Sequence, residues 1–202
     1  MGVRQNAKNK TREIILENTA MLLTKNGFIK VSSKEIAETC NVSQGTIFLH
    51  FKTKENLLIT ILNSNIIGVE NSLKQRCITT DSSDVFLKNL LDVYAENEDI
   101  LSRIYKDYPY FSDNLTRQID SLDTLVKNML FENFRKGQSK KLSIVDAFII
   151  IDAFISQLKN YLTEKEVYST SNSIIRQRRG RITKLYRMLF LWGEINDNDW
   201  KI

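Results

Sequence analysis

One stretch, from Ser32 to Lys54, constrains the fold of this chain more than any other. It opens with Ser-Ser-Lys-Glu, a capping box in which a serine hydroxyl caps the first turn of a helix and Glu35 reaches back to the backbone. The helical pattern then stops at Cys40-Asn41. Asparagine tolerates a left-handed backbone conformation better than most residues, so a tight turn is expected there.

A second short helix follows this turn. Ser43 is a favourable N-cap, and the helix should run from Gln44 to about His50. Its buried side is expected to carry Ile47, Phe48 and Phe51. Two short helices joined by a turn of about four residues predict a helix-turn-helix.

The side chains left between these apolar positions are suited to duplex DNA. Glutamine can form a paired hydrogen bond with adenine, and threonine can contact a phosphate or a thymine methyl group. Gly45 weakens a helix by roughly 1 kcal/mol but allows close approach to another backbone. Thr53 can cap a third helix, whose amino end would present N–H groups and the Lys52 and Lys54 ammonium groups to a phosphate.

The residues in and around this stretch carry a family resemblance. They are Thr11 to Ile15, Asn26-Gly27-Phe28, Ile36-Ala37, Asn41-Val42-Ser43, Gly45 to Phe48, His50-Phe51, Lys54-Glu55 and Leu57-Leu58. Over residues of about 10 to 60 the chain resembles the DNA-binding domain of the TetR family of transcriptional regulators. Leu49 departs from the family pattern, in which a phosphate-contacting tyrosine is common, and Asn41 stands where glycine is usual.

The resemblance and the residue chemistry together give one set of expected DNA contacts. Serine and lysine side chains would hold phosphates, and Gln44, Thr46 and His50 would read base edges. The full set is Ser32, Ser33, Ser43, Gln44, Gly45, Thr46, Leu49, His50, Lys52 and Lys54.

Charge supports the same assignment. Residues 1–54 contain nine lysine or arginine and four acidic residues, so they hold the whole net charge of +5, while the remaining 148 residues are balanced. Localised positive charge is typical of a domain that binds a polyanion.

Composition predicts an all-α fold. The chain has 202 residues, one proline, seven glycines and little strand-like alternation. We expect a three-helix DNA-binding domain over residues 1–53, and a helical domain for effector binding and dimerisation over residues 54–202. Two cysteines and one histidine provide no disulfide framework or metal spacing, so no metal or cofactor is expected. With no signal sequence and no apolar run that could span a membrane, a cytoplasmic protein is expected.

Helical periodicity places the other elements. The first ten residues are polar and basic, either as a frayed end or as a mobile arm that lies along the DNA backbone or in a minor groove. Long helices are expected over 11–26, 54–76, 84–107 with an interruption near Glu96, 112–136, from Ser143 onward, and 173–192.

The last two long helices are the candidates for dimerisation. The segment after Ser143 is apolar nearly all round, so it should bury more than one face. The expected contacts are Phe148, Ile151, Ile155, Ile182, Leu185, Leu189 and Trp192; a monomeric core is the alternative. The arginine-rich run from Arg176 to Arg187 is expected to be a solvated face; the alternative for Arg178 and Arg179 is pairing with acids such as Asp146 or Asp152 across the interface, or contact with an anionic ligand.

These features predict a homodimeric regulator, most simply a repressor, which releases a palindromic operator when a small, mainly hydrophobic ligand binds the second domain. The aromatic or flexible residues that could line the pocket are Phe86, Tyr94, Tyr105, Tyr108, Tyr110, Phe111, Met129 and Phe148; packing in the core is their alternative role. A DNA-binding architectural or partner-recruiting factor without an effector is the competing hypothesis. An enzyme is not expected, because the sequence shows no glycine-rich phosphate loop and no nucleophile–histidine set. The operator sequence and the identity of the effector are left open.

Overall fold

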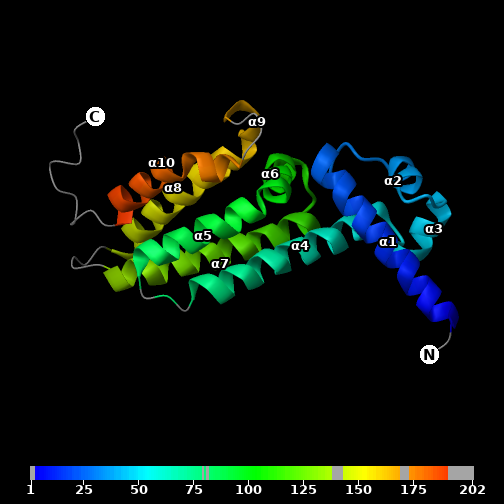
Figure 1. The fold of residues 1–202 in the computed structure, drawn as a ribbon, viewed down its shortest axis with the longest axis horizontal. Coiled ribbons are helices and arrows are strands. Elements are labelled where there is room, and N and C mark those ends of the chain that lie inside the picture. Colours follow the sequence, from blue (N-terminus) through cyan, green and yellow to red (C-terminus); the bar gives the residue numbers. More distant parts are fainter. Residues whose placement is uncertain (1–2, 79, 81, 138–142, 169–172, 191–202) are drawn as a thin grey trace. The chain divides into compact units, whose positions relative to one another are not determined.

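The structure is a computed structural model that describes residues 3–78, 80, 82–137, 143–168 and 173–190 (Figure 1). Every regular element in these ranges is helical, so the all-α prediction is confirmed. The helices are α1 (Val3–Asn26), α2 (Ser33–Thr39), α3 (Gln44–Phe51), α4 (Lys54–Cys77), α5 (Ser83–Glu96), α6 (Glu98–Asp107), the 3-10 helix η1 (Tyr108–Tyr110), α7 (Asp113–Gly137), α8 (Ile144–Thr163), α9 (Lys165–Tyr168) and α10 (Ile174–Phe190). None of the described helices is long and apolar enough to cross a membrane.

The chain packs into two compact units whose limits differ from the predicted boundary after residue 53. The first unit contains the residues up to Ile67 together with Arg103–Ile119, and the second contains Gly68–Ser102 and the residues from Asp120 onward. Helices α4, α6 and α7 therefore each contribute to both units. The division into a DNA-binding domain over residues 1–53 and an effector domain over residues 54–202 stays a prediction.

The first unit is built around one face of α1. Ile15, Thr19 and Leu23 recur at four-residue steps on this helix and are fully buried. They lie among the other buried apolar residues of this unit, which include Phe28, Ile36, Ile47, Phe51, Leu57 and Leu62. This core holds the two short helices α2 and α3 against α1.

Residues from the end of α6 cap the carboxyl end of α1. The Arg103 guanidinium donates hydrogen bonds to the carbonyl oxygens of Thr24 and Lys25, each at 3.0 Å. The carboxylate of Asp107 accepts a hydrogen bond from the Phe28 N–H at 2.6 Å. These bonds satisfy backbone groups that a helix end leaves unpaired, and they join segments about 79 residues apart in sequence.

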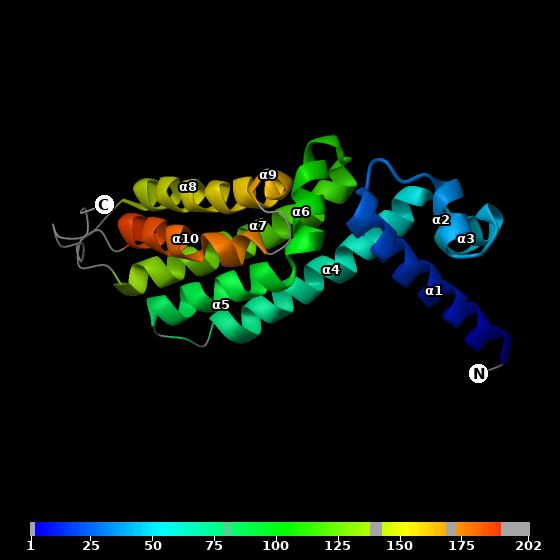
Figure 2. The same cartoon turned by 45° about the horizontal axis from the view of Figure 1, so that its top comes forward.

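The second unit is a bundle in which α10 packs against both α8 and α5 (Figures 1 and 2). Its core includes a cluster of aromatic rings from α7, α8 and α10, with Phe134, Phe154 and Tyr186 all around Phe190. Burial raises the pKa of the Tyr186 hydroxyl, so this group stays protonated and acts as a hydrogen-bond donor to the Asn133 side chain.

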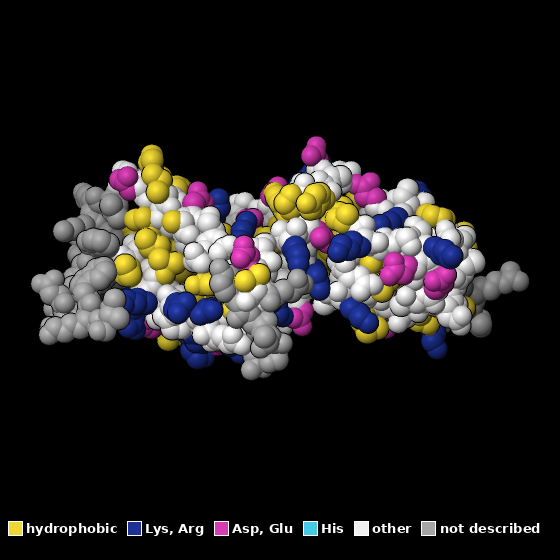
Figure 3. All heavy atoms as spheres, turned by 90° about the horizontal axis from the view of Figure 1, so that it is seen from above, with side chains coloured by type: hydrophobic (Ala, Val, Ile, Leu, Met, Phe, Trp, Pro, Cys, Tyr) yellow, Lys and Arg dark blue, Asp and Glu magenta, His cyan; other side chains and the backbone are white. Residues whose placement is uncertain are grey.

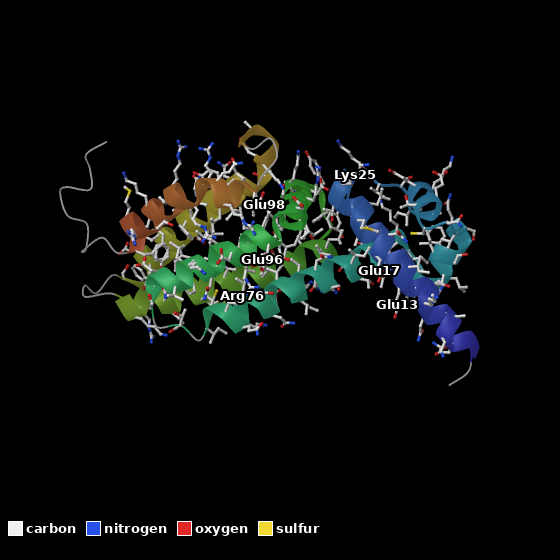
Figure 4. All side chains as sticks on the ribbon, in the orientation of Figure 1. Glu13, Glu17, Lys25, Arg76, Glu96 and Glu98 are labelled. Atoms are coloured by element: carbon white, nitrogen blue, oxygen red, sulfur yellow. The ribbon has the colours of Figure 1, made fainter. Side chains whose placement is uncertain are left out.

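A buried carboxylate holds the amino end of α10. Glu98, at the start of α6, is only 3% exposed and is labelled in Figure 4. It accepts hydrogen bonds from the N–H groups of Ile174 and Ile175 at 2.9 and 3.1 Å and from the Ser173 hydroxyl. The Lys165 ammonium lies 3.2 Å away and compensates its charge. A negative group at a helix amino end is favourable, because the unpaired N–H groups there carry partial positive charge.

The arginine-rich run on α10 forms ion pairs within its own chain. Arg179 pairs with Asp92, and Arg187 pairs with Asp84 at 3.1 Å, so the antiparallel helices α10 and α5 are joined at two points eight residues apart on each. Hydrogen bonds from Arg179 and Lys88 lower the pKa of Asp92 overall, although its partial burial acts in the opposite direction. For Arg179, the alternative of pairing with Asp146 or Asp152 across a subunit interface is not the arrangement seen, because its partner is Asp92 of its own chain.

Most predicted helix limits are confirmed within one or two residues. The interruption near Glu96 falls between α5 and α6, and Ser143 caps α8 by accepting a hydrogen bond from the Asp146 N–H. The expectation of an irregular amino-terminal arm is wrong, because α1 already begins at Val3. The predicted end of the last helix at Trp192 lies outside the described residues.

Candidate nucleic-acid interface

Local capping interactions build the helix-turn-helix. Ser32 accepts a hydrogen bond from the Glu35 N–H at 3.1 Å, and the Glu35 carboxylate accepts one from the Ser32 N–H, which completes the predicted capping box. Helix α2 ends at Cys40, and Asn41 then adopts a left-handed conformation with φ of 50°. The turn therefore forms as the sequence predicted.

Helix α3 begins at a second serine cap. The Ser43 hydroxyl oxygen accepts a hydrogen bond from the Thr46 N–H at 3.1 Å. Ile47 and Phe51, four residues apart, are buried and anchor the helix to the core. The helix is thus fixed along one side only.

The opposite side of α3 exposes Gln44, Gly45, Phe48 and Leu49. Phe48 is 41% exposed and Leu49 is 73% exposed, so the prediction that Phe48 is buried is wrong. Phe48 follows Gln44 by four residues, and such positions share one helix face. That spacing was the signal in the sequence that placed Phe48 with the exposed polar residues rather than with the core.

Gly45 has no packing reason to be glycine. A β-carbon built there would lie 3.6 Å from the Ser43 hydroxyl oxygen, which is an ordinary van der Waals contact. An alanine would therefore fit within the protein and strengthen the helix. Packing within the protein therefore does not require glycine at this position.

A strained turn follows α3. The Thr53 N–H donates a hydrogen bond of 2.7 Å to the Phe51 carbonyl oxygen, and Lys52 between them has φ of 63° and ψ of −49°. This is a γ-turn with positive φ, a rare and strained conformation for a residue with a side chain. It leaves the Lys52 side chain exposed next to the exposed face of α3.

The next helix starts at this turn. Thr53 caps α4 by accepting a hydrogen bond from the Asn56 N–H at 3.0 Å, as the sequence predicted. Lys54, the first residue of α4, is partly buried, and this burial lowers the pKa of its ammonium group despite the opposing effect of Glu35.

His50 is held in the neutral form at the carboxyl end of α3. Its pKa is lowered below 6.5 by partial burial and by the positive charges of Lys8 and Arg12. Its Nδ1 atom is buried and has no hydrogen-bond partner in the structure. Partial burial and the two nearby positive charges thus disfavour a charge on this imidazole.

The structure brings all ten predicted DNA contacts together on the first unit. They lie on α2, on α3 and at the start of α4, and at the cap positions Ser32, Ser43 and Lys52 beside these helices. Ser32, Ser43, Gln44, Gly45, Leu49 and Lys52 are exposed, whereas Ser33, Thr46, His50 and Lys54 are partly buried.

The predicted pocket residues do not form one pocket. Tyr105, Tyr108, Tyr110 and Phe111 belong to the first compact unit, and the others belong to the second. Tyr94 is buried in the core and Tyr110 is 73% exposed. Aromatic residues at helical spacing pack in many environments, so residue type alone was a poor guide to a ligand site.

A cavity of about 410 Å³ does lie in the second unit. It contains two of the predicted residues, Phe86 and Met129, and not Phe148, which is 38% exposed on α8. Its lining is Cys77, Ile78, Thr80, Phe86, Leu125, Asn128, Met129, Glu132, Asn133 and Lys136.

Several predicted dimer contacts are buried within their own subunit. Ile151, Ile155 and Ile182 are at most 4% exposed, so they pack the protomer core instead. Leu185 and Leu189 are partly buried, and Trp192 lies outside the described residues. The apolar side chains that α8 does expose are Ile144, Val145, Phe148 and Ile149. Figure 3 shows apolar side chains gathered over α8, beside the basic side chains of α10.

A capped helix-turn-helix on a basic three-helix core, joined to a helical bundle, defines a DNA-binding transcriptional regulator of the helix-turn-helix class. Residues 15–61 match the family described as bacterial regulatory proteins, tetR family. Residues 15–61 are thus a TetR-type DNA-binding domain, and the matches support a TetR-family transcriptional regulator.

Individual relatives agree with this assignment. The transcriptional repressor KstR of Mycobacterium tuberculosis is 20% identical over 163 residues, which cover 79% of this chain and 74% of KstR. The crystal structure of the TetR-family regulator PfmR of Thermus thermophilus covers 86% of this chain and 97% of PfmR, with a TM-score of 0.67 and 18% identity. AibR, crystallised with isovaleryl coenzyme A and operator DNA, covers 89% of this chain and 98% of AibR, also with a TM-score of 0.67 and 18% identity. The two structural matches show a shared fold.

Proposed function

We propose that this protein is a homodimeric, cytoplasmic transcriptional repressor that binds a palindromic operator through α3 and releases it when a small, mainly apolar ligand binds the second unit. The observation that carries the proposal is the exposed face of α3, which combines one amide side chain, a glycine with no packing role and two large apolar side chains beside Lys52. An isolated domain gains nothing from such a surface in water.

The chemistry of this face fits the major groove. Gln44 can pair with adenine, and Phe48 and Leu49 can contact the methyl group of thymine. Gly45 would let the start of α3 approach the duplex closely. The ammonium group of Lys52 and the serine caps Ser32 and Ser43 would contact phosphates and fix the register. The operator half-site should therefore contain A·T pairs opposite α3.

Selection of bound duplexes from a random DNA library tests this proposal. The expected product is an inverted repeat whose half-sites lie about one helical turn apart or slightly more, with adenine and thymine at central positions of each half. Replacing Gln44 with alanine should cost roughly 1–3 kcal/mol at one base position and leave the others unchanged. Recovery of sequences without symmetry or base preference would contradict the proposal.

A second copy of the chain is the proposed partner of the apolar face of α8. Val145 and Ile149 are 68% and 62% exposed and lie one helical turn apart. Apolar patches of this kind on a regular helix mark interaction surfaces. A twofold contact would also supply the two copies of α3 that a palindrome requires.

Sedimentation velocity tests the dimer with a matched pair of variants. Ile149→Lys should shift the protein from dimer to monomer, because it would place a charge in the interface. Ile67→Lys changes an isoleucine of similar exposure, 54%, on α4 and should leave the dimer intact. A dimer that survives Ile149→Lys would show that the subunits meet elsewhere.

The cavity among α4, α5 and α7 is the proposed effector site. Its volume of about 410 Å³ lies within the usual range for small-molecule sites. Cys77, Phe86 and Met129 provide apolar walls, while Asn133 and Lys136 offer polar groups for orientation. AibR shares this fold and was crystallised with both an acyl thioester and DNA.

The operator duplex itself provides the assay for an effector. Medium-chain acids, alcohols and lipophilic cations would be added to the protein–operator complex, and dissociation followed by fluorescence anisotropy. A compound that releases the wild type should fail against Leu125→Trp, which fills the cavity, and should still act on Ile67→Trp, which changes an exposed surface. Equal release of both variants would place the effector at another site. A protein that no compound of these classes releases would favour the architectural or partner-recruiting alternative.

A further inference from the structure

Helix α1 extends beyond the core that it helps to form. Its buried face contains Ile15, Thr19 and Leu23. Continued toward the amino end, the same face carries Arg12 and then Lys8, at steps of three and four residues. Residues 5–10 are all exposed, and in Figures 1 and 2 the first turns of α1 project past α2 and α3. A helical segment of more than one turn thus stands free of the core.

The inner face of this segment lies beside the carboxyl end of α3. The Arg12 guanidinium carbon lies 4.8 Å from the centre of the Phe51 ring, a cation–π contact that fixes its position. The positive charges of Lys8 and Arg12 both lower the pKa of His50. Lys8 lies one helical turn before Arg12 on the same face of α1 and, unlike Arg12, is exposed.

The positive charge of the first turns of α1 indicates what kind of partner they bind. Up to Arg12 the chain carries Arg4, Lys8, Lys10 and Arg12 and no acidic residue. Short helices that bury no apolar face are marginal in water, and like charges along a helix weaken it further. A polyanion held against Lys8 and Arg12 removes this repulsion, and the nearest expected polyanion is the DNA that α3 contacts.

We infer that the first turns of α1 form a second DNA-contacting element, in which Lys8, positioned beside Arg12, binds a backbone phosphate flanking the half-site read by α3. This inference rests on the proposed function, since it requires α3 to dock on duplex DNA. The contacting element is then a rigid helix and not a flexible arm. The contact therefore has a defined direction: the inner face of α1 binds DNA and the outer face does not.

Lys8 and Lys10 provide a matched test of that direction. They are two residues apart, so their side chains leave the helix about 200° apart. Both are exposed and in the same segment, and lysine-to-alanine changes there preserve helix propensity. Lys25, at the other end of α1 (Figure 4), is an exposed lysine at a distance from the proposed contact.

Affinity for the duplex selected by the wild-type protein would be measured at several salt concentrations. Lys8→Ala should lower the magnitude of the log–log salt slope by about 0.9 per half-site and weaken binding about eightfold per contact near 0.1 M salt. Lys10→Ala and Lys25→Ala should leave the slope unchanged, and Lys8→Arg should restore it. Circular dichroism would confirm that each variant keeps its helix content.

Two results would overturn the inference. Equal changes in slope for Lys8→Ala and Lys10→Ala would show a general electrostatic effect instead of a directed contact. No change for either variant would show a free helix end that DNA does not touch. Neither result would affect the proposed function, which fails only if the wild-type protein itself selects no duplex.

Discussion

Lys52 is the residue at which folding and DNA binding should oppose each other most clearly. Its φ of 63° places a lysine in a γ-turn that glycine adopts more easily. Strain of this kind costs of the order of 1–3 kcal/mol. Part of the stability gained by relieving this strain is lost again, because glycine loses about 0.5–1 kcal/mol more backbone conformational entropy on folding than a residue with a side chain. Lys52→Gly should therefore stabilise the fold by about 0.5–2 kcal/mol.

The same change should weaken DNA binding. The Lys52 ammonium group is exposed beside α3, and loss of one phosphate contact reduces the salt slope by about 0.9. Lys52→Ala separates the two effects, because it removes the charge but keeps the strain. Both variants should lose the same operator affinity, whereas only the glycine variant should gain stability.

Thermal unfolding and fluorescence anisotropy measure these two properties. For a chain of this length, 1 kcal/mol corresponds to a change in Tm of about 2–4 °C. Asn41→Gly is a useful control, since Asn41 has a similar φ of 50° but asparagine already tolerates it, so the gain should be smaller. A glycine variant no more stable than Lys52→Ala would refute the strain argument, and unchanged operator affinity in both would remove Lys52 from the interface.

Four further changes test other parts of the structure. Gly45→Ala should increase the free energy of unfolding by about 0.5–1 kcal/mol, measured by urea unfolding, and should weaken operator binding. Undiminished binding would mean that DNA does not approach Gly45. Gly27→Ala should lower the Tm by several degrees, because φ is 87° and the new β-carbon would lie 2.8 Å from the Asp107 carboxylate; an unchanged Tm would show that this turn relaxes freely. Glu98→Gln should lower stability by about 1.5–3 kcal/mol in urea unfolding, as α10 would lose its charged cap. Burial raises the pKa of Cys77 to about 11, so it should resist iodoacetamide at pH 8 in the native protein and react after unfolding; rapid native labelling would contradict this burial.

The sequence predicted the helix-turn-helix well because its determinants are local. Ser32, Ser43 and Thr53 each cap a helix through a backbone group three residues ahead, and Asn41 adopts its turn conformation within the same few residues. Interactions of this kind are contained in short windows of sequence, so reading the chain in order is sufficient to find them.

The errors occurred where distant segments decide the outcome. In an eight-residue helix with adjacent apolar residues at 47 and 48, periodicity does not fix which one is buried; packing on α1 does. The acidic partners of Arg179 and Arg187 are 87 and 103 residues away. Nothing near α10 in the sequence identifies Asp92 or Asp84 as these partners.

Helix α6 shows how one element contributes to both compact units. Its first residue, Glu98, holds the amino end of α10 in the second unit. Its last turns, through Arg103 and Asp107, hold the carboxyl end of α1 in the first unit. A helix of ten residues is about 15 Å long and stiff, so both charged caps are fixed to one rigid segment. The same helix thus supplies a charged cap to a helix of each unit. Buried caps of this kind have few intermediate arrangements, because a carboxylate or helix end left without partners is costly. Helix α6 therefore has to be assigned partly to each unit, which a single cut in the sequence cannot do.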